Sequence, residues 1–239
     1  MLDDAEIERV LVVTAHPDDV DFGAAGTIAT WTDAGIAVTY CIVTNGDAGG
    51  ADPSVPRADI PGIRQAEQRT AGLVVGVPDV RFLNYVDGEL TVTHELRRDI
   101  SRVIRQVRPQ RMLIQSPDRN WDRIFSSPPD HLAAGEAAIC AVYPDARNPF
   151  AHPSLLQDEG LVEWTVAEVW VMGTPAPNHW VDVTGQFDRK IQALHAHVSQ
   201  VAHVPEFPDR VRQWMTASAE QGGLQAGRLA EAFKVVATG

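Results

Sequence analysis

Two kinds of hydrophobic segment alternate along the chain. Short continuous runs rich in β-branched residues are typical of strands that are covered on both faces, whereas apolar residues repeating every three or four positions indicate amphipathic helices. The first pattern predicts strands at residues 10–13, 36–44, 80–83, 112–114, 166–172 and 180–183. The second predicts helices at residues 23–34, 62–75, 93–107, 131–142 and 185–199.

This alternation predicts an α/β protein, because strands joined by helices form a mainly parallel sheet with right-handed crossovers. A length of 239 residues fits one large domain. We therefore expect a single domain over residues 1–239, with a helical extension at the C-terminal end from about residue 205. The extension is predicted as one helix from Pro208 that is broken at Gly222-Gly223.

Three long irregular stretches interrupt the pattern, at residues 45–61, 116–130 and 144–160. Long loops inside a compact domain are usually functional or disordered. In an open parallel sheet, ligands bind outside the carboxyl ends of the strands, and the first two of these loops leave strands at that edge. We expect the functional site there.

The charge balance narrows the class of partner. The chain has 20 Lys+Arg against 32 Asp+Glu and a formal net charge of −12, which argues against nucleic acids and anionic membranes. The N-terminus is acidic where a signal peptide would be basic, and no apolar run approaches the ~20 residues of a membrane span. The two cysteines, Cys41 and Cys140, suit buried thiols in a reducing compartment. We expect a cytoplasmic protein.

One basic stripe needs a separate interpretation. Arg98, Arg102 and Arg105 are four and then three positions apart on the helix predicted at 93–107. An anion site is one interpretation of this spacing. Because the opposite face of the helix is apolar, we predict instead the solvated face of an amphipathic helix.

The strongest chemical signal follows the first predicted strand, where the chain reads Thr-Ala-His-Pro-Asp-Asp-Val-Asp-Phe-Gly from Thr14. Carboxylates this close, at ~4 Å, repel by about 4 kcal/mol at an effective dielectric near 20, and a divalent cation would neutralise them. His16 and Asp19 are three positions apart on a tight turn and can converge on one ion. Asp18 would remain free to take a proton from an attacking water, as metal-assisted hydrolysis requires.

A structural interpretation stays open at this point. Aspartates also favour helix N-termini for capping and dipole reasons, and His16 then has no chemical role. A third ligand would favour the metal site, and His131 is the best candidate because it follows a long loop and begins a helix. Taken alone, His131 fits better as an ordinary helix-start residue beside Asp130.

The motifs together resemble a known family. His16-Pro17-Asp18-Asp19 after a strand, with Asp130-His131 before an Ala/Gly-rich helix, is similar to the PIG-L/LmbE-like zinc-dependent N-deacetylases. The resemblance spans roughly residues 9–200 in the order of the family. Other agreeing segments are Thr44 to Gly50, Arg64 to Glu67, Asp87-Gly88, and Lys190 to Gln200. The resemblance implies a Rossmann-like three-layer fold.

The resemblance also assigns roles to individual residues. It implies that His16, Asp19 and His131 bind one catalytic Zn²⁺ with an open position for water, and that Asp18 is the general base. Asp130 and His197 are candidates for catalytic support. In the family, the residues that match Asp47, Arg64 and Asp87 contact the sugar; for each, a solvated loop or surface position is the alternative.

The implied activity is N-deacetylation of an N-acetylglucosamine-type metabolite, so the expected partner is a small molecule, with self-association left open. Two alternatives are an amidase for thiol conjugates and a degenerate zinc-binding protein with weak or no catalysis. The degenerate zinc-binding protein is motivated by Pro128, which stands where the family pattern His-Pro-Asp-His has its first histidine. That histidine assists the oxyanion or the leaving amine, and proline has no side-chain donor. His179 and His197 are the candidate substitutes.

Overall fold

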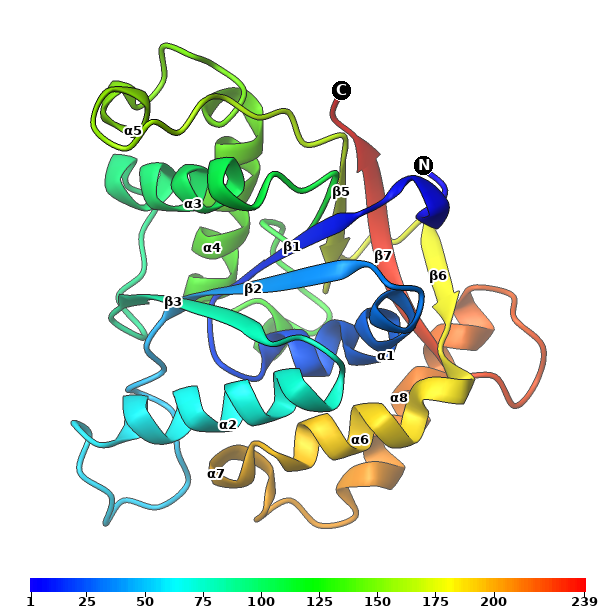
Figure 1. Cartoon of the computed structure of the whole chain (residues 1–239). Coiled ribbons are helices and arrows are strands. Elements are labelled where there is room, and N and C mark those ends of the chain that lie inside the picture. The colour runs from blue at the N-terminus through cyan, green and yellow to red at the C-terminus, as the bar shows by residue number, and fades with distance from the viewer.

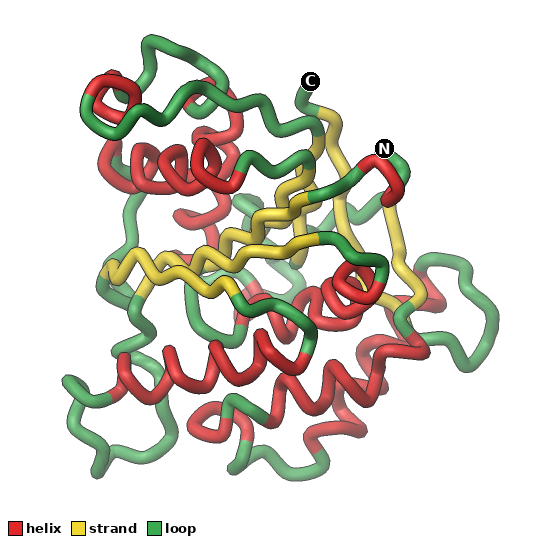
Figure 2. The backbone as a smooth tube through the Cα atoms, in the orientation of Figure 1, coloured by secondary structure: helices red, strands yellow, loops and turns green.

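The computed structural model describes all 239 residues and places a seven-stranded sheet between two layers of helices (Figures 1 and 2). The strands are β1 Arg9–Thr14, β2 Ala37–Thr44, β3 Asp79–Tyr85, β4 Arg111–Gln115, β5 Glu168–Met172, β6 His179–Asp182 and β7 Ala230–Ala237. The helices are α1 Asp19–Asp33, α2 Ile60–Val74, α3 His94–Val107, α4 Pro129–Cys140, α5 Pro153–Gln157, α6 Phe187–His195, α7 Val198–Val201 and α8 Phe207–Gln221. No helix has both the length and the apolar character that a membrane crossing needs.

The strand order is β3-β2-β1-β4-β5-β7-β6. The first five strands in this order pair in parallel, and β7 runs antiparallel to both of its neighbours. The predicted mainly parallel α/β sheet is therefore confirmed. The chain builds outward from β1 in one direction through β2 and then in the other through β4, so a crevice opens between the carboxyl ends of β1 and β4.

The alternation of side chains along β1 explains the two helical layers. Leu11 and Val13 pack with buried residues of α3 and α4, whereas Val10 and Val12 pack with α1 and α2. Because successive strand residues point to opposite faces, an uninterrupted apolar strand needs cover on both sides. Figure 2 shows helices on both sides of the strands.

The C-terminal segment corrects one prediction. The helix predicted from Pro208 is present as α8, but the chain beyond Gly222-Gly223 does not continue as a helical extension. Residues Ala230–Ala237 form β7 instead, inserted between β5 and β6. Glu231 and Lys234 interrupt the apolar run of this segment, so its sequence pattern alone does not predict a strand. It becomes one because pairing with β5 and β6 buries Phe233 and Ala230, contacts that only the folded chain supplies.

A buried ion pair fastens the start of α1 to distant parts of the chain. Lys190 of α6 donates to the carbonyls of Asp21 and Phe22 and to Glu231 of β7, the last at 2.7 Å. The Glu231 carboxylate also accepts the backbone N–H groups of α1 residues Gly26 and Thr27, at 3.0 and 2.7 Å. Both charges are thus paired and hydrogen-bonded, as burial requires. The pair fixes α1 relative to α6 and β7.

Gly135 controls how closely α4 approaches the sheet. It lies one helical turn after His131, and a Cβ atom at this position would be 2.4 Å from the carbonyl oxygen of Gln115, the last residue of β4. Only a residue without a side chain permits this approach. The approach holds the first turn of α4, and with it His131, over the carboxyl end of β4.

We expect Gly135→Ala to lower the free energy of unfolding by about 1–3 kcal/mol, the usual cost of overpacking, because backbone must move to admit the methyl group. Urea denaturation measures this change. The matched control is Gly62→Ala in α2, where a Cβ would meet no atom within 4 Å and alanine is the better helix former. Equal stability of Gly135→Ala and the wild type would contradict the assigned role of Gly135.

Candidate functional site

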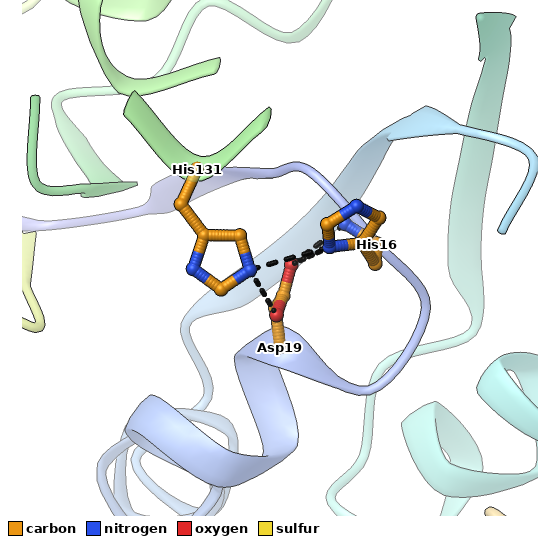
Figure 3. A group of neighbouring side chains, drawn as sticks. All are labelled: His16, Asp19 and His131. Carbon is orange, nitrogen blue, oxygen red and sulfur yellow. Dashed lines mark hydrogen bonds and ion pairs between the residues drawn. The ribbon is translucent and has the colours of Figure 1, made fainter. Parts of the chain in front are cut away.

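Three side chains from segments that follow the carboxyl ends of β1 and β4 converge on one another (Figure 3). His16 follows β1, Asp19 begins α1, and His131 lies in the first turn of α4. The His131 Nε2 atom is 3.2 Å from His16 Nδ1 and 3.0 Å from Asp19 Oδ1, and Asp19 Oδ2 is 3.4 Å from His16 Nδ1. A tetrahedral zinc ion with ligands at 2.0–2.1 Å separates its ligand atoms by roughly 3.3 Å. The three groups are therefore spaced as zinc ligands are.

Two carboxylates behind the ring orient His16. The Nε2 atom of His16 faces Asp87 Oδ1 at 3.1 Å and Asp130 Oδ2 at 3.2 Å. Such contacts fix the tautomer of a metal-binding histidine, so the lone pair of His16 Nδ1 is directed toward His131 Nε2 and Asp19.

Asp130 lies behind His16 and not among the converging atoms. Its buried carboxylate accepts the backbone N–H groups of Gly88 at 2.7 Å and Leu90 at 3.2 Å, as well as facing His16. Asp130 therefore orients the His16 ring and anchors the loop after β3.

The electrostatics of this cluster call for a cation. Burial alone lowers the pKa of His16, but the carboxylates of Asp19, Asp130 and Asp87 raise it to about 12. Burial alone raises the pKa of Asp19, yet His131 and His16 hold it well below its ordinary range. The ionic contacts of Asp19 and Asp130 are all with histidines. Positive charge is thus required between these groups.

The donor set fits a catalytic zinc ion. Two imidazole nitrogens and one carboxylate oxygen are typical zinc ligands, and three protein ligands leave a fourth position open. The side chains of His16, Asp19 and His131 are 14%, 10% and 19% exposed, so the converging groups are partly open to solvent.

Asp18 is not one of the three converging groups. Its backbone is left-handed, with φ of 99°, a conformation that costs a non-glycine residue roughly 1–2 kcal/mol. The carboxylate accepts a hydrogen bond from Arg64 at 3.2 Å. Burial raises the pKa of Asp18 to about 6, against the lowering effect of Arg64. A carboxylate of this basicity is ionised at neutral pH and suited to accepting a proton.

The three residues expected at the sugar lie at different depths. Arg64 is buried and donates to the carbonyls of Pro17 and Gly46, at 2.6 and 3.0 Å, in addition to Asp18. Asp87 contacts His16 directly and lies 3.6 Å from Arg64. Asp47 is farther out, bonded to Arg57 at 2.8 Å and to the backbone N–H of Asp87 at 3.1 Å. The structure thus brings Arg64 and Asp87, but not Asp47, against the cluster.

Neither candidate substitute for the histidine missing at Pro128 contacts the cluster. His197 is fully buried and its Nε2 atom lies 2.8 Å from Asp21 Oδ2. His179 stacks edge-on against Trp170 of β5, with the ring centroids 4.9 Å apart. The donor role at residue 128 is therefore not taken over by either ring in this geometry.

Two buried glutamines of the site were not predicted from the sequence. Gln115, at the end of β4, accepts the backbone N–H of Ala15 at 2.7 Å and joins the two strand ends beside the crevice. Gln68 accepts the backbone N–H of Asp18 at 2.8 Å. A signal for Gln68 exists in the sequence, because it follows Arg64 by four positions and so shares its helix face.

Comparisons with known proteins agree over most of the chain. A family model described as PIG-L, GlcNAc-PI de-N-acetylase, matches residues 11–142, which include His16, Asp19 and His131. A diacetylchitobiose deacetylase of Thermococcus kodakarensis is 31% identical over 236 residues, covering 97% of this chain and 84% of the relative. A probable N-acetyl-α-D-glucosaminyl L-malate deacetylase of Bacillus cereus is 33% identical, covering 80% and 83%. The solved N,N′-diacetylchitobiose deacetylase from Pyrococcus horikoshii has a TM-score of 0.88 at 28% identity, covering 97% and 85%.

We expect the protein to bind one zinc ion, and His131→Ala to reduce the zinc content strongly because it removes one of three ligands. Elemental analysis and calorimetric zinc titration measure this. His203→Ala, at an exposed histidine, is the control and should keep full zinc content. Unchanged stoichiometry and affinity in His131→Ala would remove this residue from the ligand set.

Proposed function

Because this chain belongs to the PIG-L family of GlcNAc-PI de-N-acetylases, we propose that it is a zinc-dependent N-deacetylase of small N-acetylglucosamine-type metabolites. The observation that carries the proposal is the convergence of His16, Asp19 and His131 next to a separate, partly buried carboxylate, Asp18. Similar proteins named as deacetylases of diacetylchitobiose and of N-acetylglucosaminyl malate support a sugar acetamide as the substrate.

His16, Asp19 and His131 would hold the metal through Nδ1, the carboxylate and Nε2. Zinc bound there would supply a Lewis acid for the amide carbonyl and lower the pKa of the attacking water. Asp130 and Asp87 keep the His16 ring in the orientation that binding needs, through its Nε2 atom.

Asp18 carries the proton transfers. Its carboxylate takes a proton from the water as the water oxygen bonds to the acetyl carbon, and it returns that proton to the sugar nitrogen as the C–N bond breaks. The products are acetate and the free amine. Arg64, at 3.2 Å, keeps the Asp18 carboxylate in one orientation during both transfers.

Asp87 and Arg64 border the position where the sugar must lie, and we assign the hydroxyl contacts of the substrate to this pair. Asp47 would act on the sugar only indirectly, since its carboxylate accepts the backbone N–H of Asp87 and pairs with Arg57. Asp87 and Arg64 would thus belong to the substrate pocket, and Asp47 would support the loop after β3.

Asp18→Ala should retain zinc and lose turnover by about 10²–10⁴-fold, the usual effect of removing an acid–base group. The measurement is amine release from a panel of N-acetylated amino sugars, with a chelator-treated sample as the metal-free reference. Asp52→Ala, at an exposed loop carboxylate, should behave as the wild type. Loss of zinc together with activity in Asp18→Ala would place this carboxylate in the coordination shell.

Pro128→His should raise turnover, because neither His179 nor His197 fills the donor role at this position. A missing oxyanion donor costs other enzymes roughly 10²–10³-fold, which sets the upper limit of the gain. Pro128 has φ of −63° and precedes α4, so another residue can adopt its backbone conformation. Pro128→Ala is the control for the loss of proline alone. Equal turnover of the histidine and alanine variants, both folded and zinc-loaded, would show that position 128 needs no donor.

A further inference from the structure

Two side chains of α2 contact Asp18 from one helix face. Arg64 donates to the Asp18 carboxylate at 3.2 Å, and Gln68, one turn later, accepts the Asp18 backbone N–H through Oε1 at 2.8 Å. Both side chains are buried. The hydrogen bond from Arg64 orients the Asp18 carboxylate. The hydrogen bond to Gln68 holds the Asp18 backbone, which determines the position from which the side chain extends.

The backbone bond matters because of the conformation that it accompanies. Asp18 is left-handed with φ of 99°, and a residue with a Cβ keeps such a conformation only where surrounding contacts impose it. The Asp18 N–H lies at the N-terminal end of α1, outside the helical hydrogen-bond ladder. Gln68 Oε1 is the acceptor that this N–H meets in its left-handed geometry.

Gln68 is itself held from the other side. Its Nε2 group donates to Asp21 Oδ2 at 2.8 Å, and the same oxygen lies 2.8 Å from His197 Nε2. Gln68, Asp21 and His197 are each 0% exposed. The amide of Gln68 therefore has one possible orientation, with its oxygen toward Asp18 and its nitrogen toward Asp21.

The segment that carries His197 is also tied to α2. Ser199 donates through its backbone N–H and its hydroxyl to Glu67, at 2.8 and 2.7 Å. Glu67 and Gln68 are adjacent, so two neighbouring residues of α2 bind the start of α7 and the start of α1. His197 thus lies at the far end of a rigid connection to Asp18.

We propose that Gln68 is a positioning residue for the base Asp18, and that the buried Asp21–His197 pair locks Gln68 in its working orientation. His197 then supports catalysis through Gln68, without touching the substrate. The proposal rests on the proposed hydrolase function, in which Asp18 moves the proton. The effect of Gln68 on the Asp18 backbone does not depend on that function and can be tested separately.

Gln68→Met removes the acceptor at nearly constant side-chain length. We expect kcat to fall by roughly 10–10²-fold, the effect of misplacing a reacting group by about 1 Å, with KM and zinc content unchanged. Gln65→Met is the matched control on the same helix, since Gln65 bonds only to Asn84 at the surface. If Gln65→Met lowered kcat by the same factor as Gln68→Met, the proposal would be overturned.

A double-mutant cycle separates positioning from general stability. If Gln68 acts through Asp18, then Gln68→Met should cause no further loss of turnover in an Asp18→Ala background. A merely structural role would lower the activity of both backgrounds by the same factor, and that result would overturn the proposal. His197→Gln, which keeps a donor for Asp21, should retain more turnover than His197→Leu; equal turnover would contradict the locking role.

A crystal structure of Gln68→Met gives a readout that needs no substrate. We expect Asp18 to leave the left-handed region and its carboxylate to separate from Arg64, while His16, Asp19 and His131 keep their spacing. Asp18 unchanged at positive φ would overturn the proposal. Should the wild type release no amine from any N-acetylated sugar, the proposed function would fail, and this structure would still decide the role of Gln68.

Discussion

The central constraint on this protein is the burial of negative charge at one edge of the sheet. Four carboxylates lie close together and largely buried there: Asp18, Asp19, Asp87 and Asp130. Asp19, Asp87 and Asp130 face the ring of His16. Carboxylates in such proximity ionise together only if positive charge is brought among them. The fold supplies it from three directions, with His16 after β1, Arg64 on α2 and His131 on α4. The crevice between β1 and β4 provides the space in which these elements can meet.

Much of this arrangement could be predicted from the sequence because it depends on local patterns. The apolar run at the first strand and the turn after it predicted β1 and the cluster of His16, Asp18 and Asp19, and the order of motifs indicated the family. His131 lies 115 positions after His16. The sequence still indicated it as a candidate, because it follows a long loop and begins a helix and because the order of the motifs resembles that of the family. The family and fold predictions are confirmed, while the roles of the individual site residues stay predictions.

The features that could not be predicted depend on partners distant in the chain. Arg105, expected on a solvated face, is buried and donates to the backbone carbonyls of the loop after α4, among them Ala146 at 3.2 Å and Asn148 at 2.9 Å. Its helical spacing was correct, but spacing carries no information about a loop that folds back over it. His197 shows the same limit, because its partner Asp21 lies 176 positions earlier.

The ion pair between Lys190 and Glu231 has a consequence for the order of events during synthesis. The backbone of α1, whose first residue is Asp19, is hydrogen-bonded by a lysine from α6 and a glutamate from β7, the strand that follows all others along the chain. Until β7 has been made and inserted, Lys190 has no carboxylate partner, and a buried unpaired charge is strongly unfavourable. The beginning of the active site is therefore among the first parts of the sheet to be translated and among the last to be locked. A nascent chain lacking β7 would carry the converging histidines and aspartates without a stable frame to hold them.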